Sequence, residues 1–186
     1  MATLNEAVVY KRQGDYDKAI KTYQDCLLEY ATKGTNVNVS KLYMGLGKVF
    51  ALKKNRDMAE LCYAACLFDT LNLDMFHDYK LMRSGISSQQ AINGFTQFIG
   101  LYQNLSYHIG ALFILQSDSG FKEEYNHYLE SIKGNSVATG TRDEEFTKKC
   151  ISIGFRIIDS LLDRKIDDAI LNQKLSVILK AVINYR

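Results

Sequence analysis

Four cysteines and three histidines are the residues best suited to chemistry in this 186-residue chain. Cys62 and Cys66 lie one helical turn apart, a spacing at which two thiolates can ligate one metal ion. Tetrahedral zinc needs two more ligands, and the sequence places no second cysteine pair and no histidine close to these two. We therefore predict no metal site and interpret Cys26, Cys66 and Cys150 as compact apolar core residues.

The remaining reactive residues do not form a recognisable catalytic pattern. His77, His108 and His127 stand alone on predicted helices, so we interpret them as structural. Acidic clusters at 143–145 and 167–168 fall in the first turns of predicted helices, where the helix dipole favours negative charge. The chain also lacks a phosphate-binding glycine loop, a dinucleotide fingerprint and a nucleophile elbow. We predict no catalytic residue, no cofactor and no enzymatic activity, and we keep an enzyme subunit as the least favoured alternative.

The helices that would position any functional site follow a pattern that repeats along the chain. Three residues return 40 positions later (19 to 59, 23 to 63, 26 to 66): Ala19, Tyr23 and Cys26, then Ala59, Tyr63 and Cys66. The pattern of a small residue followed four positions later by an aromatic one occurs again at 91–95, and less similar copies occur at 124–128 and 169–173. A period of this length is typical of stacked helix hairpins.

The second copy of this pattern resembles the tetratricopeptide repeat, a helix-turn-helix unit of about 34 residues. The matching residues are Tyr43, Leu46, Gly47 and Phe50 in its first helix, and Ala59, Tyr63 and Cys66 in its second. The first copy follows the pattern from Tyr10 onward but lacks the early aromatic residue, and the chain has no proline to end a repeat. The resemblance is strongest over residues 1–70. It implies an all-α fold, a right-handed solenoid of antiparallel helix hairpins with about four to five units.

We expect residues 1–186 to form a single domain of this kind. Its predicted parts are clear repeats at 3–32 and 40–71, degenerate repeats at 73–103 and 104–133, and a C-terminal helix pair at 142–185. Asp15 is the predicted N-cap of the second helix. The phase of the helix within 104–116 stays open, because two registers fit the pattern. Turn-forming residues at 117–120 and 134–140 separate the later helices.

The last predicted helix, 166–185, has an apolar face that is large for the exposed end of a repeat array. Its members are Ile170, Leu175, Ile178, Leu179, Val182 and Ile183. Such a face either folds back on the array or meets a partner, which includes self-association through the C-terminal helices. We favour folding back.

Composition and charge limit the classes of partner and the location that the sequence predicts. Hydrophobic residues make up 47% of the chain and charged residues 24%, as in ordinary globular proteins. A net charge of +2 with no basic run does not favour nucleic acid. The N-terminus lacks a signal-peptide pattern, and polar residues interrupt the longest apolar stretch, 98–115, so we predict no membrane segment. We expect a cytoplasmic protein.

The family resemblance implies a protein–protein interaction module: an adaptor, scaffold or chaperone-like protein that binds a peptide or partner helix in its concave groove. The pattern places five residues on that inner face: Val8, Lys11, Lys41, Met44 and Lys48. Together they suit an acidic or amphipathic peptide. Leu4 and Val8 stand where chaperone-tail clamps of the family carry Lys and Asn, which argues against a chaperone C-terminus. The alternative is a peptide-sensing regulatory or signalling protein.

Overall fold

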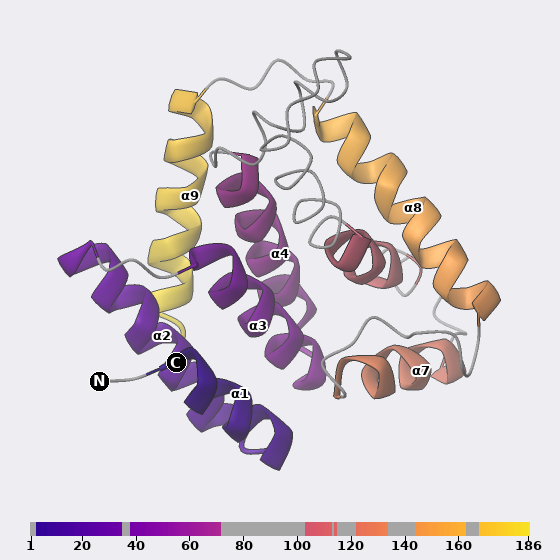
Figure 1. Cartoon of the computed structure of the whole chain (residues 1–186), viewed down its shortest axis with the longest axis horizontal. Helices are drawn as coiled ribbons and strands as arrows, with labels where there is room; N and C mark the ends of the chain where they lie inside the picture. Colours follow the sequence, from indigo (N-terminus) through magenta and orange to yellow (C-terminus); the bar gives the residue numbers. More distant parts are fainter. Residues whose placement is uncertain are drawn as a thin grey trace, which may run out of the picture.

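The structure is a computed structural model that describes residues 3–34, 38–71, 103–112, 114, 122–133, 144–162 and 168–186. Within these ranges every regular element is an α-helix, so the all-α prediction is confirmed (Figure 1). Nearly all of the predicted repeat at 73–103 lies outside the described residues, as do the predicted turns at 117–120 and 134–140 and His77. Among the described helices, none combines the length and the apolar character that a membrane span requires.

The first four helices form two consecutive hairpins. They are α1 (Leu4–Gln13), α2 (Tyr16–Lys33), α3 (Val39–Leu52) and α4 (Arg56–Leu71). Their bounds agree with the predicted repeats at 3–32 and 40–71 to within a residue or two. α1 begins with a capping box, in which the Thr3 side chain accepts from the Glu6 N–H while the Glu6 carboxylate accepts from the Thr3 N–H. Asp15 caps α2 as predicted, because its side chain accepts from the Lys18 N–H.

The two hairpins turn in the same way, 40 residues apart. Gly14 and Lys54 both adopt left-handed backbone angles, with φ of 80° and 61°. The next residues, Asp15 and Asn55, each donate their N–H to the carbonyl five positions earlier, and each caps the following helix with a side-chain oxygen. The repeat seen in the sequence is therefore also a repeat of the backbone. Lys54 occupies a conformation that favours glycine, at a cost of roughly 1 kcal/mol.

The repeated residues build the core of these hairpins. Ala19 and Ala59 are fully buried, and Tyr23 and Tyr63 nearly so. The Tyr23 hydroxyl lies 2.3 Å from where a Cβ on Gly45 would stand, so α2 reaches across to the next hairpin. The four cysteines are buried and form no disulfide, which agrees with the core positions predicted for Cys26, Cys66 and Cys150.

Residues 103–112 and 114 form a further helix, called the buried helix below, which lies between α4 and α8 (Glu144–Leu162) (Figure 1). Its buried residues are Leu105, Ser106, Tyr107, His108, Gly110, Ala111, Leu112 and Ile114. Because they surround the helix axis, the helix has no single apolar face. This explains why two registers fitted the sequence pattern equally well.

The buried helix and α8 cross with their backbones in contact. A Cβ on Gly110 would lie 1.9 Å from the Cys150 carbonyl oxygen, and one on Gly154 would lie 1.8 Å from the Ser106 carbonyl oxygen. Gly110 lies opposite Cys150, whereas Ser106, one turn earlier on the buried helix, lies opposite Gly154, one turn later on α8. The two helices therefore run antiparallel at this contact. Only residues without a side chain permit so close an approach.

The last helix, α9 (Asp168–Ile183), returns to the first half of the chain and packs against α4 and α2 (Figure 1). It buries Leu171, Ile178 and Val182, so the prediction that its apolar face folds back on the array is confirmed at Ile178 and Val182. The two helices of the predicted C-terminal pair lie apart: α8 contacts the buried helix, whereas α9 contacts α4 and α2. Ile170 and Val177 stay exposed on α9.

Candidate functional site

The five residues predicted to bind a partner lie on α1 and α3, the first helices of the two hairpins. The structure places them at different depths. Lys41 is exposed and Val8 is half-buried, whereas Met44 and Lys48 are each 6% exposed and Lys11 is 4% exposed. The burial of Lys11 and Lys48 differs from the partner-accessible position predicted for them. A helical pattern shows which face a residue occupies, but it does not show what covers that face.

Lys11 and Lys48 bring two positive charges into one interior region. Burial, together with the charges of Lys48 and Arg12, lowers the pKa of Lys11 to about 8. Burial also lowers the pKa of Lys48. Within the described parts of the chain, Lys48 forms no ion pair with an acidic side chain. Burying a lysine without a partnering charge is costly, and the lowered pKa of Lys48 expresses that cost.

His108 of the buried helix faces the same region. It is fully buried, and neither ring nitrogen has a hydrogen-bond partner among the described residues. Burial lowers the pKa of His108 well below its ordinary value of 6.5, and the charges of Lys48 and Lys11 lower it further. The imidazole is therefore neutral at pH 7, with one nitrogen able to donate and the other able to accept. One turn earlier on the same helix, the side-chain oxygen of Asn104 is also buried, and the described part of the chain offers it no hydrogen-bond partner.

Three tyrosines surround the His108 ring. Tyr63 stacks on it with ring centroids 5.4 Å apart, and Tyr107 and Tyr128 meet it edge to face at 5.3 and 5.7 Å. The hydroxyls of Tyr63 and Tyr128 are hydrogen-bonded at 3.0 Å, which ties α4 to α7 (Lys122–Lys133). Burial raises the pKa of Tyr63, so this hydroxyl stays neutral. These contacts hold the imidazole in one orientation.

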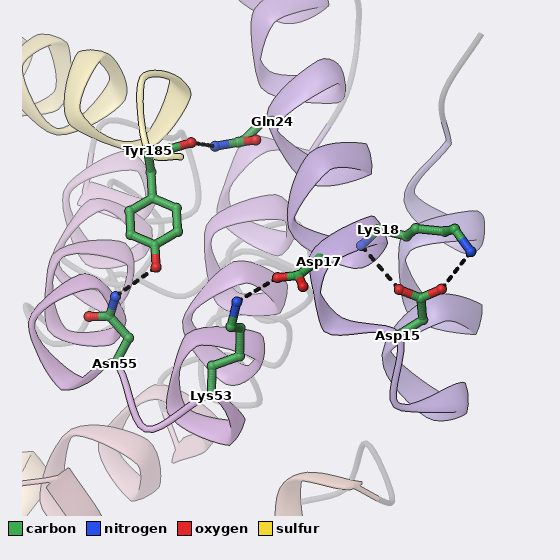
Figure 2. A network of polar contacts seen from close by, with 7 residues as sticks. All are labelled: Asp15, Asp17, Lys18, Gln24, Lys53, Asn55 and Tyr185. Atoms are coloured by element: carbon green, nitrogen blue, oxygen red, sulfur yellow. Dashed lines mark hydrogen bonds and ion pairs between the residues drawn. The ribbon is translucent and has the colours of Figure 1, made fainter.

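A second polar network holds the last residues of the described chain (Figure 2). The Gln24 side-chain nitrogen donates to the carbonyls of Val182 and Tyr185, at 2.9 and 2.8 Å. The Tyr185 ring packs edge-on against Phe50 at 4.9 Å, and its hydroxyl accepts from the Asn55 side chain at 3.1 Å. The same Asn55 caps α4 through its oxygen. This network fixes the end of α9 against both hairpins.

A cavity of about 660 Å³ lies beside this second network. It is lined by Asp17, Ile20, Lys21, Gln24, Lys53 and residues 183–186. Its two lysines already have acidic partners. Lys53 pairs with Asp17 at 2.5 Å (Figure 2), and Lys21 pairs with Asp25 at 2.9 Å.

Sequence reasoning interpreted His108 as a structural histidine and did not connect it with the lysines. The connection depends on an electrostatic interaction between residues 60 positions apart in the chain, which no local spacing can reveal. The described residues hold no group of three side chains of the types that ligate metal ions.

Comparison with known proteins finds no match to this chain among protein-family models, curated proteins or solved structures.

Proposed function

We propose that this chain is a protein–protein interaction module, an adaptor, scaffold or chaperone-like protein of the tetratricopeptide type, which binds a peptide or partner helix along α1 and α3. The observation that carries the proposal is the repeated hairpin, in which core residues, left-handed turn and helix cap all recur at an interval of 40 residues. Repeated hairpins that stack in a right-handed solenoid present the first helix of each unit along one continuous face. Such a face is suited to an extended or helical ligand.

Lys41 is the most exposed of the five residues proposed to line this face. It is exposed near the start of α3, while Lys11, Met44 and Lys48 lie beneath the surface. An exposed lysine at the rim of a binding face attracts acidic segments and mainly affects the association rate. The partner favoured by this arrangement is therefore an acidic or amphipathic peptide.

A selection from a library of displayed peptides, followed by fluorescence anisotropy on the selected sequences, tests this function. We expect acidic or amphipathic peptides to be enriched, and Lys41→Glu to weaken their binding by about tenfold, or roughly 1.4 kcal/mol. Lys180→Glu is the matched control, since Lys180 is an exposed helical lysine on α9 and the change in net charge is the same. Both variants should keep the helicity and melting temperature of the natural protein.

Equal losses in the two variants would mean that only overall charge matters. Unchanged binding in Lys41→Glu would remove the site from the α1 and α3 face.

A further inference from the structure

We propose that His108 is a pH-sensitive switch for the packing of the buried helix and α7 on α4. In its neutral form the imidazole holds these three helices together, and protonation of the ring opens the contact between them. The proposal goes beyond the peptide binding described above and does not depend on it.

The place of His108 in the buried helix directs its side chain toward α4. Ser106 and Gly110, one turn apart, both meet the backbone of α8. His108 lies midway between them, and two residues turn an α-helix by about 200°, so His108 is on the opposite side of the helix. There the Tyr63 ring of α4 stacks on the imidazole, with ring planes 13° apart. His108 therefore lies in the interface between the buried helix and α4.

α7 contacts the same imidazole. The Tyr128 ring of α7 meets it edge to face at 5.7 Å, and the Tyr128 hydroxyl is hydrogen-bonded to the hydroxyl of Tyr63 at 3.0 Å. Tyr107 of the buried helix contacts the imidazole at 5.3 Å and the Tyr128 ring at 6.2 Å. One aromatic cluster thus joins three helices that are distant in sequence, and the imidazole contacts every other ring in it.

The surroundings of the ring do not favour an imidazolium. His108 is fully buried, and the described residues give neither ring nitrogen a hydrogen-bond partner. The three tyrosines, and the Cys62 and Cys66 thiols of α4, are neutral below about pH 8. The charges that act on the ring are those of Lys48 and Lys11, and both oppose protonation. A stacked tyrosine attracts a cation, but more weakly than complete removal from water disfavours it.

Acid should therefore populate a state in which the imidazole reaches water. Burial lowers the pKa of His108 well below its ordinary value of 6.5, so below this pH the open state binds a proton that the closed state does not. Relative to neutral pH, the ratio of open to closed molecules should rise about tenfold at pH 5.5 and about a hundredfold at pH 4.5. Opening parts the buried helix and α7 from α4 and uncovers the Tyr63 side of α4.

Amide hydrogen exchange of the full chain, measured by NMR at about pH 7.5, 5.5 and 4.5, tests the switch. Rates are expressed as protection factors, which remove the effect of pH on intrinsic exchange. We expect the protection of the buried helix and α7 to fall by the factors given above, while α1 and α2 keep theirs. His108→Phe is the matched variant, because it keeps an aromatic ring in the cluster but cannot take up a proton. Its protection should change little over this range.

The natural protein decides the question even if His108→Phe fails to fold. The NMR signals of the His108 imidazole report its protonation, and uptake of the proton together with the loss of protection supports the switch. The proposal is overturned if the ring is protonated while the buried helix and α7 keep their protection, or if neither changes down to pH 4.5. It is also overturned if α1 and α2 lose protection equally, or if a folded His108→Phe protein responds to pH as the natural one does.

Discussion

Replacing Gly154 with alanine should force the buried helix and α8 apart. The added methyl group would lie 1.8 Å from the Ser106 carbonyl oxygen, whereas ordinary contact begins at 3.4 Å, so the backbones must separate by about 1.6 Å at this point. The obstacle is backbone and not the flexible end of a side chain. The overpacking cost should therefore fall in the upper part of the usual range of about 1–3 kcal/mol.

A second effect opposes this cost. Alanine is a better helix former than glycine by about 1 kcal/mol in a helix interior. The net destabilisation expected for Gly154→Ala is therefore about 1–2 kcal/mol, which lowers the melting temperature of a chain of this size by about 2–8 °C. Gly110→Ala should behave in the same way, because its methyl group would meet the Cys150 carbonyl at 1.9 Å.

Thermal and urea unfolding, followed by circular dichroism at the helical minimum, measure this effect. Ser152→Ala is the control, because Ser152 is exposed on the same helix and the change alters helix propensity without adding to the crossing. The variant with both Gly110→Ala and Gly154→Ala should lose less stability than the two single losses together, since the first methyl group already separates the helices. If Gly154→Ala were as stable as Ser152→Ala, the backbones would not be in contact and the reasoning would be refuted.

Two further predictions concern the hairpins. Lys54→Gly should raise the free energy of unfolding by up to about 1 kcal/mol in urea titrations, because Lys54 has the left-handed conformation that Gly14 has in the first hairpin; a loss of stability would contradict the turn geometry. The pKa of Lys11 is about 8 in the folded protein, against an ordinary value of 10.5. Between pH 8 and pH 10.5 the unfolded chain therefore binds more protons at this residue than the folded protein does, so Lys11 makes the free energy of unfolding rise with pH across that window. The difference in unfolding free energy between the natural protein and Lys11→Met should change between pH 8 and pH 10.5, because the titrations that both proteins share cancel in this difference. A difference that stays constant over this pH range would mean that Lys11 is not buried as a cation.

The hairpins could be predicted from the sequence because their signals are local. Ala19 and Tyr23 return at Ala59 and Tyr63, and Asp15 marks the start of a helix by a capping preference that acts within one turn. Each of these signals depends on residues a few positions apart. The bounds of α1 to α4 therefore agreed closely with the prediction.

The surroundings of the inner face could not be predicted in this way. Lys48 sits on the predicted face of α3, but its burial and the effect of its charge on the pKa of His108 depend on elements that are distant in sequence. The buried helix carries apolar or small residues on all sides, so its pattern could not reveal which side meets α4 and which meets α8. The role of Gly110 and Gly154 could not be predicted either, because only the helix crossing itself shows that a side chain would not fit there.

The docking of α9 changes how the chain should fold. In an open array each unit contacts only its neighbours, so the ends can unravel one unit at a time. Here Gln24 reaches carbonyls 158 and 161 positions away, and α9 contacts both α2 and α4. Closing so long a loop costs entropy before any contact forms, so α9 should dock late, after the two hairpins have formed. Once docked, it links the second helices of both hairpins, and fraying of the first hairpin from the chain end then requires breaking the contacts of α9 as well.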